Sequence, residues 1–241
     1  MIFENRTIMK KISLLLLTAA FALSLVATSC NKDTNTYVQG TVTVKSDEAN
    51  PIYLQLDERT VLKPTNMSKN PYGREMRAFV MFIDKGKMED RLGMEWRNAE
   101  ICRIDSIRTK LPDPTLGSKE EDEKIYGKDQ IDILDSWVTC VEDGYLTLDF
   151  RARWGNTHKV KHIVSLVKGT DPNNPYYFDL RHNSNGDDFS GGYHYEEGVI
   201  AFDVKDLIDG SKDTYVFTLH YNSDVHAGEH TISINYTPAK K

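Results

Sequence analysis

Histidine is the residue type in this sequence whose distribution first suggests chemistry. All seven histidines follow residue 157: His158, His162, His182, His194, His220, His226 and His230. A zinc site needs three or four ligands that converge at about 2 Å from one ion. On a strand, His158 and His162 would share a face but lie about 13 Å apart. His226 and His230 flank a predicted turn and could approach across a hairpin. We therefore predict surface or cross-strand histidines, with no metal and no cofactor.

An acidic, oxygen-rich loop follows His182. It reads Asn183-Ser184-Asn185-Gly186-Asp187-Asp188. Calcium takes six to eight oxygen ligands, but the loop lacks the bidentate glutamate that closes an EF-hand. A solvated turn is the interpretation we favour, and calcium binding is left open.

Aromatic side chains crowd the same region of the sequence: Tyr176, Tyr177, Phe178, Phe189, Tyr193 and Tyr195. Strand alternation points Phe178 into a core, whereas exposed tyrosines offer a flat apolar face and a polar tip. With the nearby amides and carboxylates they could bind a sugar or a protein. The candidate binding patch comprises Asn183, Asn185, Asp187, Asp188, Phe189, Tyr193 and Tyr195.

Motifs of catalysis do not stand out. The sequence has neither a Gly-x-Ser-x-Gly elbow nor a His-Glu-x-x-His pair. A nucleophilic cysteine needs an activating, partly open site, whereas Cys102 and Cys140 lie in apolar, strand-like stretches. They could pair in an oxidising compartment or remain two buried free thiols. We predict that the protein is not an enzyme, with a hydrolase carrying an unrecognised site as an alternative.

Charge is distributed unevenly along the chain. Residues 37–110 carry 13 Lys and Arg against 11 Asp and Glu, whereas residues 111–241 carry 13 against 23. Nucleic-acid affinity depends largely on the neutralisation of phosphates. The acidic second half therefore argues against a nucleic-acid partner.

The N-terminus has the three-part pattern of an export signal. Lys10 and Lys11 precede an uncharged apolar stretch over 12–28, and small residues follow. Ala27-Thr28-Ser29-Cys30 resembles a bacterial lipobox, which implies cleavage after residue 29 and a lipid on the Cys30 thiol. We predict a signal peptide over 1–29 and a polar tether over 30–36. A plain signal peptide or an uncleaved anchor helix is the alternative.

Strand-like patterns dominate residues 37–110. Small or apolar residues alternate with polar ones from Val38 to Lys45, which is typical of a half-buried strand. Arg77 to Ile83 is a near-continuous apolar run that suits a strand covered on both faces. Further strands are predicted at Ile52–Leu56, Val61–Leu62 and Ile101–Ile107. Short strands at this density favour a small barrel over a helical bundle.

Residues 111–130 are predicted to be a linker and residues 131–241 a second all-β domain. The prolines of Leu111-Pro112-Asp113-Pro114 interrupt regular structure, and Lys119 to Lys124 is predicted to form a solvated loop with at most one helical turn. Further on, Glu142-Asp143-Gly144 is a turn signal between two strand patterns. Seven strands are predicted: Trp137–Val141, Tyr145–Trp154, His158–Val167, Tyr176–His182, Val199–Val204, Tyr215–Tyr221 and Thr231–Tyr236. Their spacing favours an immunoglobulin-like β-sandwich.

Several segments together resemble a known family. They are Trp137-Val138-Thr139, the run from Val141 to Leu148, and the run from Asp179 to Asp187. With the lipobox and the order of domains, they resemble the NigD-like lipoproteins, which are named from a bacteriocin operon. The resemblance implies an N-terminal OB-like barrel over 37–110 and a C-terminal immunoglobulin-like sandwich over 131–241. It implies no established activity and no catalytic residues.

Three functions follow from these observations. The first is a non-catalytic binding or structural module for a protein or glycan partner, held at a lipid membrane through acylated Cys30. The second is a bacteriocin-linked immunity or envelope factor, and the third is the hydrolase. For each we expect a location outside the cytoplasm, on the outer membrane of a Gram-negative bacterium.

Overall fold

The computed structural model describes residues 36–91, 93–156 and 160–238. Residues Thr36–Lys241 form one compact unit. The predicted signal peptide, Cys30 and the tether up to Asn35 lie outside the described residues. Among the described residues, no helix has the length and apolar character needed to cross a membrane.

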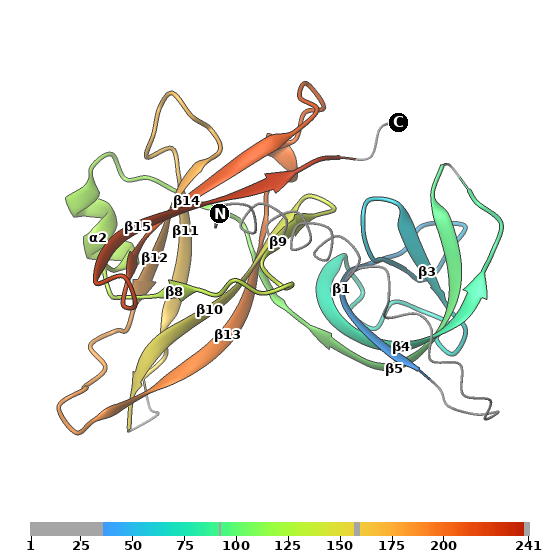
Figure 1. Ribbon diagram of the computed structural model, residues 1–241, viewed down its shortest axis with the longest axis horizontal. Helices are drawn as coiled ribbons and strands as arrows, with labels where there is room; N and C mark the ends of the chain where they lie inside the picture. Colours follow the sequence, from blue (N-terminus) through green and yellow to red (C-terminus); the bar gives the residue numbers. More distant parts are fainter. Residues whose placement is uncertain (1–35, 92, 157–159, 239–241) are drawn as a thin grey trace, which may run out of the picture. The chain divides into compact units, whose positions relative to one another are not determined.

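The first half of the described chain is a closed five-stranded barrel, with strand order β1-β2-β3-β5-β4 (Figure 1). Its strands are β1 (Tyr37–Lys45), β2 (Tyr53–Gln55), β3 (Thr60–Pro64), β4 (Met76–Lys87) and β5 (Glu95–Ser106). Closure satisfies the hydrogen bonds of the edge strands, which would otherwise be open to pairing. The predicted small barrel is confirmed.

Alternation along the barrel strands sends one set of side chains into a common core. Val42, Val44, Leu54, Leu62 and Ala78 are fully buried in it. Burying such side chains is the main favourable term in folding, at roughly 25 cal/mol per Å² of apolar surface. β4 and β5 pair over most of their length and are longer than the sequence predicts.

The chain between the barrel and the sandwich holds more regular structure than predicted. β6 (Arg108–Lys110) pairs with β13, and β7 (Asp113–Pro114) pairs with β11. The expectation of a loop with one helical turn is wrong for 119–126, where helix α2 (Lys119–Tyr126) forms. The Ser118 side chain accepts a hydrogen bond from the Glu121 backbone N–H, which is the N-cap bond of a capping box. The sequence contains the helix-start signal Ser118-x-x-Glu121, but the charge run over 119–124 also fits an exposed loop.

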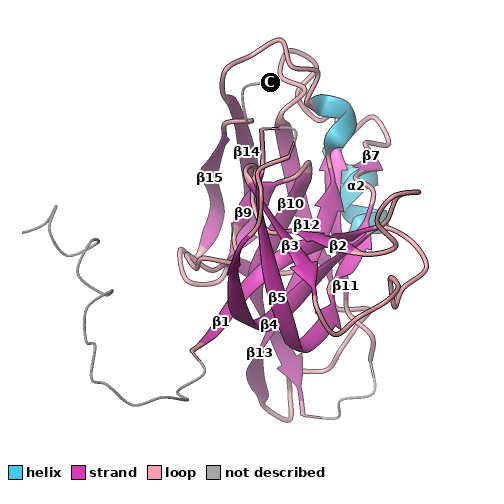
Figure 2. Cartoon of the chain, turned by 90° about the vertical axis from the view of Figure 1, so that its right-hand side faces the viewer, coloured by secondary structure: helices cyan, strands magenta, loops and turns pink. Residues whose placement is uncertain are grey.

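The second half is a β-sandwich of two sheets, one ordered β6-β13-β10-β8 with β9 paired to β10, the other ordered β15-β14-β12-β11-β7. In Figure 2 the strands are drawn in magenta, and they make up most of the described chain. The sandwich strands are β8 (Asp132–Ile133), β9 (Cys140–Glu142), β10 (Tyr145–Gly155), β11 (Ile163–Lys168), β12 (Tyr177–Asn183), β13 (Tyr193–Asp203), β14 (Tyr215–Ser223) and β15 (Gly228–Tyr236). The all-β architecture, an OB-like domain followed by a sandwich, is confirmed.

The core between the two sheets is built by the predicted alternating positions. Leu146, Leu148, Phe178, Phe202 and Phe217 are all fully buried there. The Phe178 and Phe217 rings stack with centroids 6.3 Å apart. Phe178 is therefore a core residue, as predicted, and not part of a surface patch.

The β9–β10 hairpin turns where the sequence predicts. Asp143 and Gly144 both have positive φ, at 50° and 77°, and a two-residue loop with both φ positive is the type I′ hairpin turn. The first strand is shorter than predicted and begins at Cys140. Before it, the Thr139 backbone N–H bonds to the Ser136 carbonyl in a turn, which leaves Trp137 60% exposed.

Two other predicted strands have different bounds. β11 begins at Ile163, although the sequence predicts a strand from His158. Residues 157–159 of that prediction lie outside the described residues. β13 begins at Tyr193, six residues before the predicted start, because its first half pairs with the extended end of β10, up to Gly155.

The two described cysteines are free, so no disulfide joins them. Cys102 is exposed on β5, because strand alternation points Ile101 inward and Cys102 outward. The prediction of two buried thiols is therefore wrong for Cys102. Cys140 is half-buried, and burial raises the pKa of its thiol to about 12.

We expect the two thiols to differ sharply in reactivity. The thiolate is the nucleophile, and at pH 8 the raised pKa of Cys140 keeps it protonated. In protein that starts after Cys30, a maleimide should label Cys102 rapidly and Cys140 at a rate at least tenfold lower. Cys102→Ser should remove the fast phase, and comparable labelling of Cys140 in the native state would contradict this assignment.

Candidate functional site

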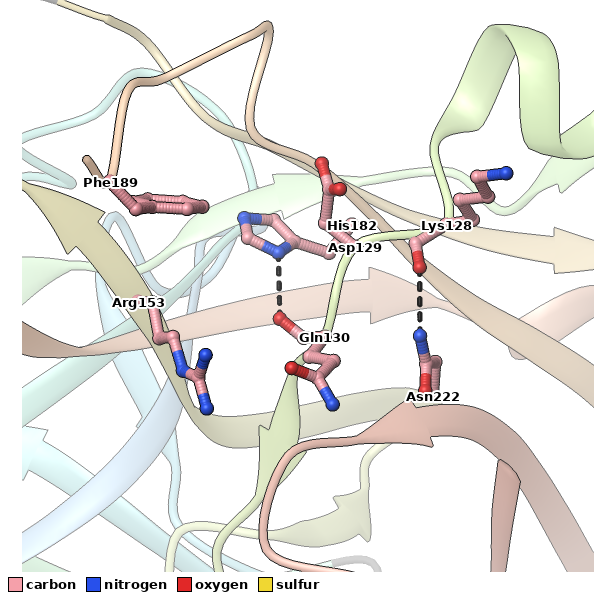
Figure 3. Close-up of a pocket in the computed structure, with 7 residues that line it drawn as sticks. All are labelled: Lys128, Asp129, Gln130, Arg153, His182, Phe189 and Asn222. Carbon is pink, nitrogen blue, oxygen red and sulfur yellow. Dashed lines mark hydrogen bonds between the residues drawn. The ribbon is translucent and has the colours of Figure 1, made fainter. Parts of the chain in front are cut away.

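The candidate site is a pocket in the sandwich, with a volume of about 360 Å³ (Figure 3). It is lined by Lys128, Asp129, Gln130, Arg153, His182, Phe189 and Asn222. These residues come from the segment between α2 and β8, from β10, β12 and β14, and from the loop between β12 and β13. The volume is at the small end of the range for ligand sites, roughly 300–1,000 Å³.

One wall of the pocket is the segment 127–130, which lies directly against β12. The Asp129 backbone N–H donates to the His182 carbonyl at 3.0 Å. The Asn222 side-chain amide donates to the Lys128 carbonyl at 2.9 Å, as Figure 3 shows. Gly127 permits this close approach, because a Cβ there would lie 2.2 Å from the His182 carbonyl oxygen.

Arg153 enters the pocket from β10 with its charge already paired. Its Nε donates to the Asp224 carboxylate at 2.7 Å, and a second guanidinium nitrogen bonds the same carboxylate. The Tyr195 hydroxyl also donates to Asp224, and this hydrogen bond raises the pKa of Tyr195. Such a bidentate pair fixes the plane of the guanidinium. Arg153 therefore acts as an oriented donor and flat surface more than as a free cation.

An aromatic ladder of Phe189, Tyr193 and Tyr195 continues from the pocket along β13. The Phe189 and Tyr193 rings lie edge to face at 6.4 Å, and those of Tyr193 and Tyr195 at 5.8 Å. The Arg153 guanidinium lies 4.6 Å from the Tyr193 ring centroid, within cation–π range. Tyr193 and Tyr195 are 45% and 44% exposed. Large aromatic rings held in place at a surface are typical of binding sites.

The structure places the predicted patch residues in two groups. Phe189, Tyr193 and Tyr195 lie together at the pocket and beside it. Asp187 is buried instead, where its Oδ2 accepts from the Gly155 backbone N–H at 2.6 Å. Its direction follows from Gly155, since a Cβ there would lie 2.7 Å from Asp187 Oδ1.

The remaining patch residues serve the acidic loop itself. The Asp188 carboxylate accepts from the Ser190 backbone N–H and hydroxyl, and these bonds lower the pKa of Asp188. The Asn183 side chain accepts from the Asn185 backbone N–H at 2.8 Å. Within the described residues, no three histidine, cysteine, aspartate or glutamate side chains are grouped to hold a metal ion.

Two histidines that no sequence pattern connects meet beneath the pocket. His162 Nδ1 lies 2.9 Å from His182 Nε2, and His162 Nε2 lies 3.1 Å from Asp187 Oδ2. The prediction of surface or cross-strand histidines is confirmed for this pair in its cross-strand form, since the two rings meet where β11 and β12 pair. They are buried and not at the surface, because His182 and the His162 side chain are each only 1% exposed. The prediction is also confirmed for His226 and His230, whose rings stack at 3.9 Å across the β14–β15 turn.

The pair is poorly placed for acid–base catalysis. His182 is the histidine that lines the pocket, and both of its ring nitrogens are engaged. Nδ1 lies 2.9 Å from the Gln130 carbonyl oxygen, and Nε2 faces His162. A general base needs a ring nitrogen within reach of the substrate proton. The geometry therefore suits binding better than proton transfer.

Sequence reasoning missed five residues that also line the pocket: Lys128, Asp129, Gln130, Arg153 and Asn222. None belongs to a motif, and each is an ordinary polar residue near the end of a strand or in a connection. The topology alone brings the segment after α2 beside the ends of β12 and β14.

Comparison with known proteins agrees with this architecture. Residues 41–107 match the NigD-like N-terminal OB domain, and residues 114–236 match the NigD-like C-terminal beta sandwich domain. No match is found among curated proteins.

Solved structures of proteins from Parabacteroides and Bacteroides species share the fold. A "TOXIN related protein" of Parabacteroides distasonis is 26% identical with a TM-score of 0.64, covering 84% of this chain and 94% of its own. A protein called a lipoprotein, from Bacteroides fragilis, is 14% identical with a TM-score of 0.58, covering 85% and 100%. A "NigD-like immunity protein" of Bacteroides caccae is 15% identical with a TM-score of 0.54, covering 86% and 100%. Together, the two domain matches span most of the described residues, and the chain belongs to the NigD-like family.

Proposed function

We propose that this protein is a non-catalytic binding module of the cell envelope that holds a protein or glycan partner in the pocket of its sandwich. The observation that carries the proposal is the pocket itself, with the aromatic ladder beside it. Phe189 offers a ring, Arg153 offers an oriented donor, and Gln130 and Asn222 offer amide groups (Figure 3). Apolar surface with a few fixed polar groups is the usual composition of a ligand site.

The proposal places the module on a membrane through a lipid on Cys30. Its support is the basic, apolar and small-residue pattern that ends at Ala27-Thr28-Ser29-Cys30. Several acyl chains hold a protein at a bilayer, since each buried CH₂ contributes about 0.8 kcal/mol. The proposed location is the outer membrane of a Gram-negative bacterium.

A second function is an immunity or envelope factor against a bacteriocin. It is favoured by the names of two structural neighbours, one called toxin-related and the other an immunity protein. Deletion of the gene should then sensitise the producing cells to the cognate bacteriocin. Unchanged sensitivity would remove this function and leave the binding module.

The binding proposal predicts that the pocket variant Phe189→Ala loses affinity by about tenfold or more. Truncation of a central aromatic contact typically costs over 1 kcal/mol, and 1.4 kcal/mol is a factor of ten. A thermal-shift screen against glycans and envelope proteins would find the ligand, and calorimetry would measure each variant.

Val216→Ala provides the matched control. Val216 is 45% exposed and lies on β14, the strand that also carries Asn222. The two positions are six residues apart along the strand, a separation of about 20 Å. Equal loss in both variants, or no stabilisation by any compound in the screen, would count against the pocket.

A further inference from the structure

His162, His182 and Asp187 form a hydrogen-bonded chain beneath the pocket. Asp187 Oδ2 meets His162 Nε2, His162 Nδ1 meets His182 Nε2, and His182 Nδ1 meets the Gln130 carbonyl oxygen. The three separations are 3.1, 2.9 and 2.9 Å, all within hydrogen-bond range. Each contact therefore needs one hydrogen atom between its two heavy atoms.

The number of ring protons decides whether all three bonds can form. The Gln130 carbonyl can only accept, and so can an ionised Asp187 carboxylate, so the ring nitrogens that face them must carry hydrogen. The contact between the two rings needs a third hydrogen. Two neutral imidazoles supply only two N–H groups. The complete chain therefore holds one proton more than two neutral histidines, and this proton balances the charge of Asp187.

The surroundings show where the extra proton resides. Burial lowers the pKa of His182, so that ring is the neutral one. A hydrogen bond from the Gly155 backbone N–H lowers the pKa of Asp187, which keeps the carboxyl ionised. The hydrogen count then leaves the extra hydrogen on His162, and the Trp154 ring stacks on this ring with centroids 3.7 Å apart. A cation against an indole face is a favourable contact.

Because Asp187 is buried, the extra proton is needed to compensate the charge of its carboxylate. Within the part of the chain that the structure describes, Asp187 Oδ1 is buried without a hydrogen-bond partner, so the contacts of Oδ2 carry most of the compensation for this carboxylate. An uncompensated buried charge is costly. Without the extra proton, the chain would carry a net negative charge and one of its three contacts would lose its hydrogen.

We propose that His162, His182 and Asp187 form a one-proton lock that holds the walls of the pocket together. The lock joins the segment 127–130 through Gln130, the end of β12 through His182, and the loop that carries Phe189 through Asp187. The effect of the lock on ligand binding rests on the proposed function of the pocket, whereas its hydrogen bonds form whether or not the pocket binds a ligand.

Other charged groups face the lock from the surrounding elements. They are Asp129 and Lys128 from the segment before β8, Asp188 from the acidic loop, Arg153 from β10 and Arg108 from β6. Asp129 raises the proton affinity of His182 and His162 lowers it. Among the described residues, the hydrogen bonds of the two rings run to Asp187, to the Gln130 carbonyl and between the rings themselves.

The sign of the pH dependence follows from the proton count. All three hydrogen bonds of the lock need the extra proton, so the lock is complete only while that proton is bound and is lost as the pH rises and removes it. At acidic pH a second proton on His182 would place two N–H groups face to face. The lowered pKa of His182 moves that event to a lower pH.

Nitrogen-15 NMR of the histidine rings tests the lock in protein without any ligand. We expect His182 as the neutral ring with its hydrogen on Nδ1, and His162 with both nitrogens protonated. Both rings should report the same one-proton step, because coupled groups titrate as a pair. Above that step, amide hydrogen exchange at Ser184 to Asp187 should accelerate at least tenfold after correction for intrinsic rates. Independent titration of the two rings would overturn the proposal.

Asp187→Asn and Asp188→Asn form a matched pair of variants. Both remove one negative charge from the same loop, but only Asp187 contacts His162, whereas Asp188 bonds Ser190. We expect Asp187→Asn to shift the step of the pair to lower pH and Asp188→Asn to leave it nearly unchanged. Equal shifts would overturn the lock. If Asp187→Asn fails to fold, the histidine ring spectra of the wild-type protein still test the lock. These spectra are recorded without ligand, so they do not depend on whether the pocket binds one.

Discussion

Gly127→Ala is expected to lower the free energy of unfolding by about 2–6 kcal/mol, the sum of a backbone cost and a steric cost. Gly127 ends α2 with φ 93° and ψ 169°, a backbone region that is essentially restricted to glycine and costs another residue about 1–3 kcal/mol. The added Cβ would also lie 2.2 Å from the His182 carbonyl oxygen and 2.6 Å from the Asn183 Cα. Backbone atoms cannot rotate away, so the segment 127–130 would have to leave β12, at a further cost of about 1–3 kcal/mol.

Gly210→Ala separates the two contributions. Gly210 also has positive φ, at 76°, but apart from its chain neighbours no atom of the described residues lies within 4 Å of the position that a Cβ would occupy there. It should lose only about 1–2 kcal/mol, the cost of the left-handed backbone. Denaturant unfolding of both variants measures the difference. Equal losses would show that the segment 127–130 and β12 do not approach each other this closely.

Cys30→Ser is expected to move the protein from the membrane fraction to the soluble fraction. Serine has no thiol to accept the lipid, so the variant would lose an anchor in which each buried CH₂ contributes about 0.8 kcal/mol. Cys102→Ser should leave the distribution unchanged, because Cys102 lies on a barrel strand. Fractionation followed by immunoblotting measures both variants.

Mass spectrometry of the native protein completes this test. A mature chain that begins at Cys30 and carries the added mass of acyl groups is the expected result. The uncharged stretch over 12–28 has 17 residues, short of the roughly 20 typical of a membrane-spanning helix. An unmodified chain that retains this stretch would contradict the lipid anchor.

Local patterns were enough to predict the fold. The alternation of Leu146, Leu148 and Phe150 on β10 describes a half-buried strand, and all three side chains are buried in the sandwich core. The turn at Asp143-Gly144 is also a local signal, since both residues tolerate positive φ. Helix α2 is harder to predict, because the charge run over 119–124 indicates exposure and the helix signal is confined to the Ser118 and Glu121 capping pair.

The site was only partly predictable, because its residues are brought together by topology. Phe189, Tyr193 and Tyr195 are close in sequence and were identified as a patch. His162 and His182 are 20 residues apart and meet only because β11 and β12 pair as antiparallel neighbours. Asp187 looked like a solvated loop residue, yet the absence of a side chain at Gly155 lets it turn inward. The residue pattern of a single strand cannot show which side chains of different strands and loops come together.

Chemical-shift mapping with a ligand from the thermal-shift screen tests the binding role of the pocket most directly. Titration of nitrogen-15-labelled protein should perturb the amides of Gln130, Arg153, Phe189 and Asn222 first, with smaller changes along Tyr193 and Tyr195. Phe189→Ala should abolish these changes at the same ligand concentration. Perturbations confined to the barrel, or an undiminished response in Phe189→Ala, would contradict the assignment of this pocket as the binding site.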